Sequence, residues 1–151
     1  MELILWRHAE AEDSIPDMAR ELTSKGQKQA KHVAAWLKPR LPEGTRILVS
    51  PALRTQQTAV ALGMDFSTLD ALAPDTAAEA VLAAAGWPNH PQSALIVGHQ
   101  PTLGEVASIM LQSSIPSMSI KKGAVWWFSA RRGDPRDIIL KAMLSPDILQ
   151  D

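Results

Sequence analysis

The chain has 151 residues, 46% of them hydrophobic, and this size and composition predict a single domain over residues 1–151 with one core. A formal net charge of −1 argues against bulk nucleic-acid binding, and the absence of cysteine excludes disulfides, zinc–thiolate sites and thiol nucleophiles. The apolar runs are too short to span a bilayer and no signal-peptide pattern precedes the first predicted strand, so we expect a cytoplasmic protein without a membrane partner.

Predicted strands and helices alternate along the first half of the chain. Residues 2–7 are apolar on both faces, which is typical of a buried parallel strand, and the polar residues 9–22 predict a loop. Ser50 and Pro51 favour a helix start, because a capping hydroxyl is followed by proline in the first turn. We therefore predict a helix from a capping box at Ser24 to just before Pro39, a strand over residues 46–49, and a helix from Ser50 to about Leu62, where Gly63 ends it.

The second half continues this alternation and ends in a hairpin. The pattern predicts a brief edge strand over residues 65–69, a helix capped by Asp75 or Thr76 with Glu79 and ended by Gly86, a strand over residues 93–97, a helix from a capping box at Thr102 to about Leu111, and strands over residues 123–130 and 137–144. Strands separated by helices favour parallel pairing, whereas a short turn-rich loop joins the last two strands. We expect an α/β fold with three αβα layers, a mainly parallel central sheet and an antiparallel C-terminal hairpin.

Two histidines stand where apolar strands end. His8 follows the strand over residues 2–7, and His99 closely follows the strand over residues 93–97. Ligands of open α/β sheets bind beyond the carboxyl ends of parallel strands, so we expect both imidazoles at one edge, with Arg7 beside them. Arg54 lies in the first turn of the helix predicted after the next strand and has a route to the same place. Two imidazoles and two guanidinium groups predict an anion site, and phosphate is the favoured anion.

These four side chains suit phosphoryl transfer without a metal or any other cofactor. The neutral imidazole of His8 can attack phosphorus in line and form a phosphoenzyme, which water then hydrolyses. Neighbouring arginines disfavour a charged His8 and so keep it nucleophilic. Arg7 and Arg54 can clamp the phosphoryl oxygens, and a protonated His99 can stabilise the charge that develops on them.

Three segments of the chain resemble the signatures of the histidine phosphatase superfamily, which includes phosphoglycerate-mutase-like enzymes. They are residues 5–9 (LWRHA), 50–58 (SPALRTQQT) and 98–101 (GHQP), and they occur in the family's order along the whole chain. The short length, the absence of a large insert and the stretch LTSKG after Arg20 are most similar to SixA-type bacterial phosphohistidine phosphatases.

This resemblance implies roles for individual residues. It makes His8 the nucleophile, and it places Arg7, Arg54 and His99 around the phosphate. It also implies that Arg20 assists substrate binding, although an ordinary surface arginine is an equal alternative.

The chain departs from the wider family at two points. Ala9 stands where most members have glycine, which is tolerated if the backbone keeps a negative φ. No acidic residue is a convincing proton donor: Glu10 and Asp70 are the candidates, and a solvated loop is the competing interpretation of Glu10. An alkoxide leaving group needs a positioned acid more than the labile P–N bond of phosphohistidine does, so this weakness favours a phosphoramidate substrate.

The favoured function is therefore removal of phosphate from phosphohistidine in a signalling protein, such as a phosphorelay domain. Two alternatives remain: a small-molecule phosphomonoesterase that uses the same site, and a phosphate- or phosphoprotein-binding module without turnover. The sequence does not fix the oligomeric state. A group of basic residues could attract an acidic partner, although a solvated face is the better interpretation; its members are Lys121, Lys122, Arg131, Arg132 and Arg136.

Overall fold

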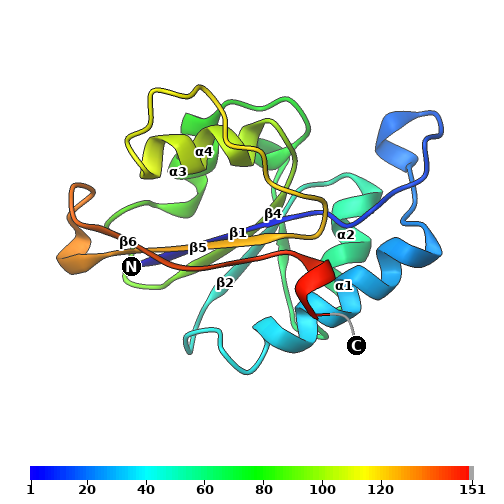
Figure 1. Cartoon of the computed structure of the whole chain (residues 1–151), viewed down its shortest axis with the longest axis horizontal. Coiled ribbons are helices and arrows are strands. Elements are labelled where there is room, and N and C mark those ends of the chain that lie inside the picture. The colour runs from blue at the N-terminus through cyan, green and yellow to red at the C-terminus, as the bar shows by residue number, and fades with distance from the viewer. Residues whose placement is uncertain (150–151) are drawn as a thin grey trace.

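Two strands that are apolar on both faces lie side by side in the middle of the sheet. β1 (Glu2–Arg7) and β4 (Ala94–Gly98) pair in parallel, and residues 3–6 and 94–97 are fully buried. Such strands require cover on both sides. The computed structural model, which describes residues 1–149, shows this arrangement as an α/β fold with a six-stranded sheet between two layers of helices (Figure 1).

The remaining strands complete a mixed sheet in the order β3-β2-β4-β1-β5-β6. They are β2 (Arg46–Val49), β3 (Ser67–Thr68), β5 (Val125–Ala130) and β6 (Ile138–Leu144). β2 is parallel to both β4 and β3, whereas β5 is antiparallel to β1 and to β6. The expected mainly parallel sheet with an antiparallel C-terminal hairpin is thus confirmed. The predicted edge strand over residues 65–69 exists, but it pairs over two residues only.

The helices divide between the two faces of the sheet. They are α1 (Ser24–Leu37), α2 (Leu53–Val60), α3 (Ala78–Ala85) and α4 (Thr102–Met110). Successive strand residues point to opposite faces, so Ile4 and Trp6 pack with α1 and α2, while Leu3 and Leu5 pack with α3 and α4 (Figure 1). No helix within residues 1–149 has the length and apolar character needed to cross a membrane.

The first two helices exist as predicted, but their N-caps differ. The hydroxyl of Thr23, not Ser24, accepts a hydrogen bond from the Gly26 amide of α1 at 2.9 Å. α2 begins at Leu53 rather than directly after Ser50, and no side chain caps it. Ser50 fails as a cap because its hydroxyl is engaged at the edge of the sheet.

The start of α3 and the cap of α4 also differ from the prediction. α3 begins at Ala78, after Asp75 and Thr76, and its N-cap Ala77 has no capping side chain. The Thr102 hydroxyl, expected to cap α4, instead donates to the Thr76 carbonyl at 2.7 Å. The Thr102 error has a physical cause: short polar side chains that can cap a helix also make tertiary hydrogen bonds, and a pattern of residues does not distinguish the two uses. The predicted end of α3 is correct, since Gly86 has the left-handed conformation.

Candidate active site

The central strand β4 holds the ends of its two neighbours by backbone hydrogen bonds. The amide of His8 donates to the Gly98 carbonyl and the amide of Ser50 donates to the Val97 carbonyl, each at 3.1 Å. The residue after β4 is His99. Its ring centroid lies 5.4 Å from that of His8, with the two planes inclined by 55°. The structure therefore brings the two histidines together at the carboxyl edge of the parallel strands, as the sequence predicts.

The imidazole of His8 has a fixed orientation and a defined tautomer. Its Nδ1 lies 2.7 Å from the Ala9 carbonyl oxygen, which can only accept, so Nδ1 carries the hydrogen and Nε2 carries the lone pair. Burial is the largest cause of a His8 pKa lowered to about 3; the Ala9 hydrogen bond opposes the shift, and the charges of His99, Arg54 and Arg7 contribute to it. His8 is thus neutral at pH 7 and has a nucleophilic nitrogen.

His99 is held by a residue that sequence reasoning assigned to a helix cap. Its Nε2 lies 2.7 Å from the Ser50 hydroxyl oxygen, which also accepts from the Ala52 amide at 3.3 Å. Burial is the largest cause of a pKa lowered to about 4; Arg54 lowers it as well, and Asp17 opposes the shift. A dianion nearby would raise the pKa of His99 and favour its protonated form.

The two arginines reach the site from different elements. Arg7 ends β1 and donates through Nη1 to the Ile120 carbonyl at 2.8 Å. Arg54 lies in the first turn of α2, is 4% exposed, and donates to the Asp17 carbonyl at 2.8 Å and to its carboxylate at 3.2 Å. Burial lowers the pKa of Arg7, because it disfavours the charged form. The positive charge of the nearby Arg54 lowers it as well.

Several buried nitrogens of this region lack hydrogen-bond partners. Within residues 1–149 four buried side-chain nitrogens are unpaired, and three of them are Arg7 Nε, Arg54 Nε and His99 Nδ1. A buried polar group without a partner costs about 1–3 kcal/mol, and such groups are rare in native proteins. Their concentration on three of the four predicted side chains indicates a site built for an anion that can accept from them.

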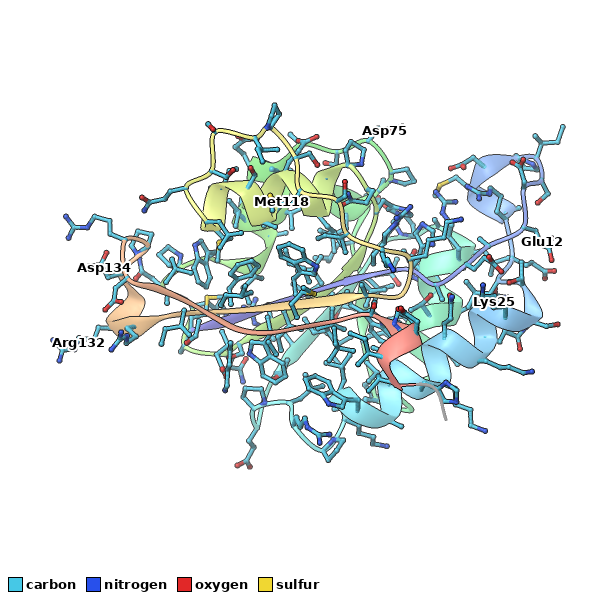
Figure 2. All side chains as sticks on the ribbon, viewed as in Figure 1. Glu12, Lys25, Asp75, Met118, Arg132 and Asp134 are labelled. Carbon is cyan, nitrogen blue, oxygen red and sulfur yellow. The ribbon has the colours of Figure 1, made fainter. Side chains whose placement is uncertain are left out.

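Arg20 joins this group through a carboxylate that sequence reasoning missed. The polar loop after β1 contains a 3-10 turn (Asp17–Ala19), and Asp17 binds Arg54 through one carboxylate oxygen and Arg20 through the other, at 3.2 and 3.3 Å. Arg20 also donates to the Glu12 carbonyl at 2.7 Å. Figure 2 shows Glu12 on this loop, near Lys25 at the start of α1. Nothing marks Asp17 in the sequence, because it is one of several acidic residues in a polar loop.

The two candidate proton donors are placed differently. Glu10 accepts a hydrogen bond from the Thr23 hydroxyl at 2.8 Å and so lies against the start of α1. Asp70 is exposed and begins a 3-10 turn (Asp70–Leu72) after β3. Within residues 1–149 no hydrogen bond joins either carboxylate to His8 or His99.

Ala9 fits its position without strain. It is fully buried, and its amide donates to the Thr58 hydroxyl at 3.1 Å. Thr58 in turn donates to the Arg54 carbonyl at 2.7 Å, which joins the His8 loop to α2. The left-handed backbone of non-glycine residues occurs elsewhere, at Asp75, Gln112 and Arg132. Ala9 therefore keeps a negative φ, and its methyl group is tolerated.

Metal ligands do not gather in the part of the chain that the structure describes. No group of three or more histidine, cysteine, aspartate or glutamate side chains in residues 1–149 is arranged to hold a metal ion.

Comparison with known proteins assigns this fold and site to a class. The model of the histidine phosphatase superfamily (branch 1) matches residues 3–74, which include His8 and Arg54. An uncharacterized protein of Picosynechococcus is 36% identical over 136 residues, which cover 83% of this chain and 82% of that protein. The chain belongs to the histidine phosphatase superfamily.

Within that superfamily the chain is SixA-like. It is 29% identical to the phosphohistidine phosphatase SixA of Escherichia coli over 127 residues, 78% of this chain and 79% of that protein. The structure of the protein histidine phosphatase SixA complexed with tungstate superposes with a TM-score of 0.79 at 25% identity, covering 99% of this chain and all of that one. The SixA homologue described from Agrobacterium tumefaciens gives a TM-score of 0.77 at 26% identity, covering 96% and 97%. The resemblance inferred from three short motifs is confirmed.

Proposed function

We propose that this chain is a phosphohistidine phosphatase that works through a phosphorylated His8 and needs no metal ion. The observation that carries the proposal is the fixed tautomer of His8, whose Nε2 lone pair is free beside two arginines with unpaired buried nitrogens. In this proposal residues 1–151 act as one domain. His8 is the nucleophile, Arg7, Arg54 and His99 bind the phosphoryl group, and Arg20 assists through Asp17.

Two displacements at phosphorus make up the proposed reaction. Solvent first protonates the other ring nitrogen of the substrate's phosphohistidine. The His8 Nε2 lone pair then forms a bond to phosphorus while the P–N bond of the substrate breaks, and the leaving imidazole departs as a neutral ring. Arg7 and Arg54 balance the negative charge of the phosphoryl oxygens, and a protonated His99 donates to one of them. Water then attacks phosphorus, the P–Nε2 bond of His8 breaks, and inorganic phosphate leaves.

The ionisation of Asp17, the carboxyl group that binds Arg54, supports phosphohistidine over a phosphate ester. Partial burial raises the pKa of Asp17, but its hydrogen bonds and ion pairs with Arg54 and Arg20 outweigh this and lower the pKa overall. Asp17 is therefore ionised at neutral pH and is a poor acid for an alkoxide leaving group. An imidazole leaving group is far less basic than an alkoxide and needs less help.

The similarity to SixA of Escherichia coli suggests the kind of substrate protein. Because a SixA phosphohistidine phosphatase is similar along most of this chain, we infer that the substrate is a phosphohistidine-bearing protein of a cytoplasmic phosphorelay. Phosphoramidate and free phosphohistidine are then small substrates of the same chemistry.

The test is to trap the intermediate during turnover of phosphoramidate. The wild-type protein should form an acid-labile phosphoenzyme, His8→Asn should form none while still binding tungstate, and His32→Asn, a change at an exposed position of α1, should behave as wild type. Arg7→Ala or Arg54→Ala should each reduce kcat/KM about a hundredfold. Chelators should have no effect, and loss of activity in EDTA would contradict the metal-free mechanism.

A substrate screen separates the alternatives. Rapid hydrolysis of sugar phosphates or nucleotides with none of phosphohistidine would establish a small-molecule phosphomonoesterase. Phosphate binding without any phosphoenzyme would establish a binding module.

A further inference from the structure

A basic cleft of about 510 Å³ lies beside the proposed phosphate site and shares Arg7 with it. Four cationic and two acidic side chains contribute to its lining: Arg7, Lys25, Lys121, Lys122, Glu10 and Asp147. The chain as a whole has a net charge of −1, so this excess of positive charge is local.

The two acidic residues of the cleft leave much of this positive charge unbalanced. Glu10 accepts the hydrogen bond of Thr23. Asp147 accepts a hydrogen bond from Ser145 and lies 3.8 Å from Lys121, at the outer limit of an ion pair. Lys25 and Lys122 form no ion pair within residues 1–149.

Lys25 occupies a position that is electrostatically unfavourable for the isolated protein. It lies in the first turn of α1, where the helix dipole already contributes positive charge and the helix itself has no acidic residue; Glu10, from the loop after β1, lines the same cleft. Cations are unfavourable at a helix N-terminus, yet Lys25 stands there next to two further lysines. This exception indicates a surface that receives an anionic partner.

Backbone hydrogen bonds hold Lys121 and Lys122 in a fixed position relative to His8. Lys121 and Lys122 lie between two anchor points: Arg7 donates to the Ile120 carbonyl, and the Gly123 amide donates to the His8 carbonyl at 2.9 Å. A protein with its phosphohistidine at His8 would therefore place the surface around that histidine against these lysines. The 72% exposed side chain of Lys121 suits attraction of a charged protein surface better than enclosure of a small metabolite.

The other basic residues of the predicted group are elsewhere. Arg131, Arg132 and Arg136 lie beyond the far end of β5, and Figure 2 shows Arg132 and Lys25 at opposite ends of the molecule. Arg131 pairs with Asp137 and Arg136 pairs with Asp134, as expected of a solvated face. The five basic residues grouped together in the sequence analysis thus form two separate sets.

We propose that Lys25, Lys121 and Lys122 dock the acidic side chains that flank the phosphohistidine of a protein substrate. The inference rests on the proposed function and adds to it the kind of surface that the substrate presents. Arg7 would bind the phosphoryl group while the three lysines form ion pairs with the acidic side chains around it.

The test compares two phosphohistidine peptides of equal length, one with aspartate and glutamate around the histidine and one with asparagine and glutamine. Wild type should prefer the acidic peptide about tenfold in kcat/KM at low salt, and high salt should reduce the preference. The triple variant Lys25→Gln, Lys121→Gln, Lys122→Gln should lose the preference but hydrolyse phosphoramidate as wild type does. The matched control Arg131→Gln, Arg132→Gln, Arg136→Gln removes the same charge from the far end and should retain the preference.

The outcomes separate the docking surface from the chemistry. No preference in wild type, or equal loss in both triple variants, would overturn the docking surface while turnover of phosphoramidate left the proposed function intact. If wild type hydrolysed neither phosphoramidate nor peptide, the proposed function would fail. Binding of the two peptides to His8→Asn, which needs no turnover, would then still decide whether the cleft prefers the acidic one.

Discussion

Neutral groups rather than carboxylates orient the two histidines. The Ala9 carbonyl fixes the His8 ring, and the Ser50 hydroxyl contacts Nε2 of His99. If Ser50 donates this hydrogen bond, the hydrogen of a neutral His99 lies on Nδ1, the nitrogen that lacks a partner in the described chain. Ser50 would then position His99 Nδ1–H as a donor to a phosphoryl oxygen.

Removing the Ser50 hydroxyl tests this positioning role. Ser50→Ala should lower kcat about tenfold, the effect of losing one hydrogen bond of about 1.4 kcal/mol, and should shift the pH profile of kcat. Ser108→Ala is the control, since Ser108 is also buried but its hydroxyl donates to the Ile115 carbonyl at the other end of α4. An unchanged pH profile in Ser50→Ala would mean that this hydroxyl serves stability alone.

The Asp17 carboxylate forms an ion pair with Arg54, which is proposed to bind the phosphoryl group. Because this charge opposes an incoming oxyanion, Asp17→Asn should bind inorganic phosphate about threefold to tenfold more tightly. Asp13→Asn, a change at an exposed acid of the same loop, should have little effect. Calorimetric titration gives the two affinities, and weaker binding by Asp17→Asn would show that Asp17 chiefly holds Arg54 in place.

At the residue scale, sequence could predict side chains whose position follows from a strand end. His8 and His99 directly follow buried strands, so their meeting is a consequence of sheet topology. The roles of Ser50 and Asp17 depend on distances between loops, and no periodic pattern encodes those distances. A short polar residue between a strand and a proline was the one available signal for Ser50.

Among the elements, α1 and the loop after β1 approach each other unusually closely. A Cβ atom on Gly26 would lie 1.9 Å from the Glu10 carbonyl oxygen, so only glycine permits this contact. The Thr23 amide donates to the same carbonyl at 3.0 Å. The glycine of the LTSKG stretch therefore holds the start of α1 against the loop that leaves His8.

Adding one methyl group should separate these two elements. Gly26→Ala should lower the free energy of unfolding by about 1–3 kcal/mol, because backbone atoms must move apart, and should reduce turnover as the loop after His8 shifts. Urea titration and phosphoramidate hydrolysis measure the two effects. Ser24→Ala, at an exposed position in the same turn, should change stability by less than about 0.5 kcal/mol. Equal stabilities of the two variants would contradict the close approach.

Elements were predictable where burial imposes a repeating pattern and less so at their ends. The apolar runs of β1 and β4 predicted these strands, and the four-residue patterns that begin at Ser24 and Thr102 predicted α1 and α4 with their approximate bounds. α3 begins at Ala78, after its predicted caps Asp75 and Thr76, and the caps predicted at Ser50 and Thr102 are absent because both hydroxyls make tertiary hydrogen bonds instead. Such partners are distant in sequence and are known only once the chain is folded.

For the molecule as a whole, the two buried histidines should make stability depend on pH. Burial lowers the pKa of His8 to about 3 and that of His99 to about 4, from an ordinary value of 6.5 that the unfolded chain recovers. Between pH 6.5 and these values the unfolded chain binds protons that the folded chain does not. The free energy of unfolding should therefore fall as the pH drops through this interval, by at most about 1.4 kcal/mol per pH unit for each histidine.

Urea unfolding at a series of pH values measures this dependence. The double variant His8→Asn, His99→Asn should show a flatter fall in stability below pH 6.5 than wild type, whereas His32→Asn should not. Identical slopes in wild type and the double variant would mean that both histidines accept protons in the folded protein.

The backbone hydrogen bonds from β4 to His8 and Ser50 have a consequence for local opening. β4 is fully buried and has a neighbouring strand on each side, so it can separate from them only when the sheet itself comes apart. The amide protons of His8 and Ser50 should then exchange with deuterated solvent no faster than global unfolding allows. Those of the surface loop around Asp17 should exchange through small, frequent fluctuations. The side of the site formed by the strand ends should therefore open rarely, whereas the side formed by this loop should open often.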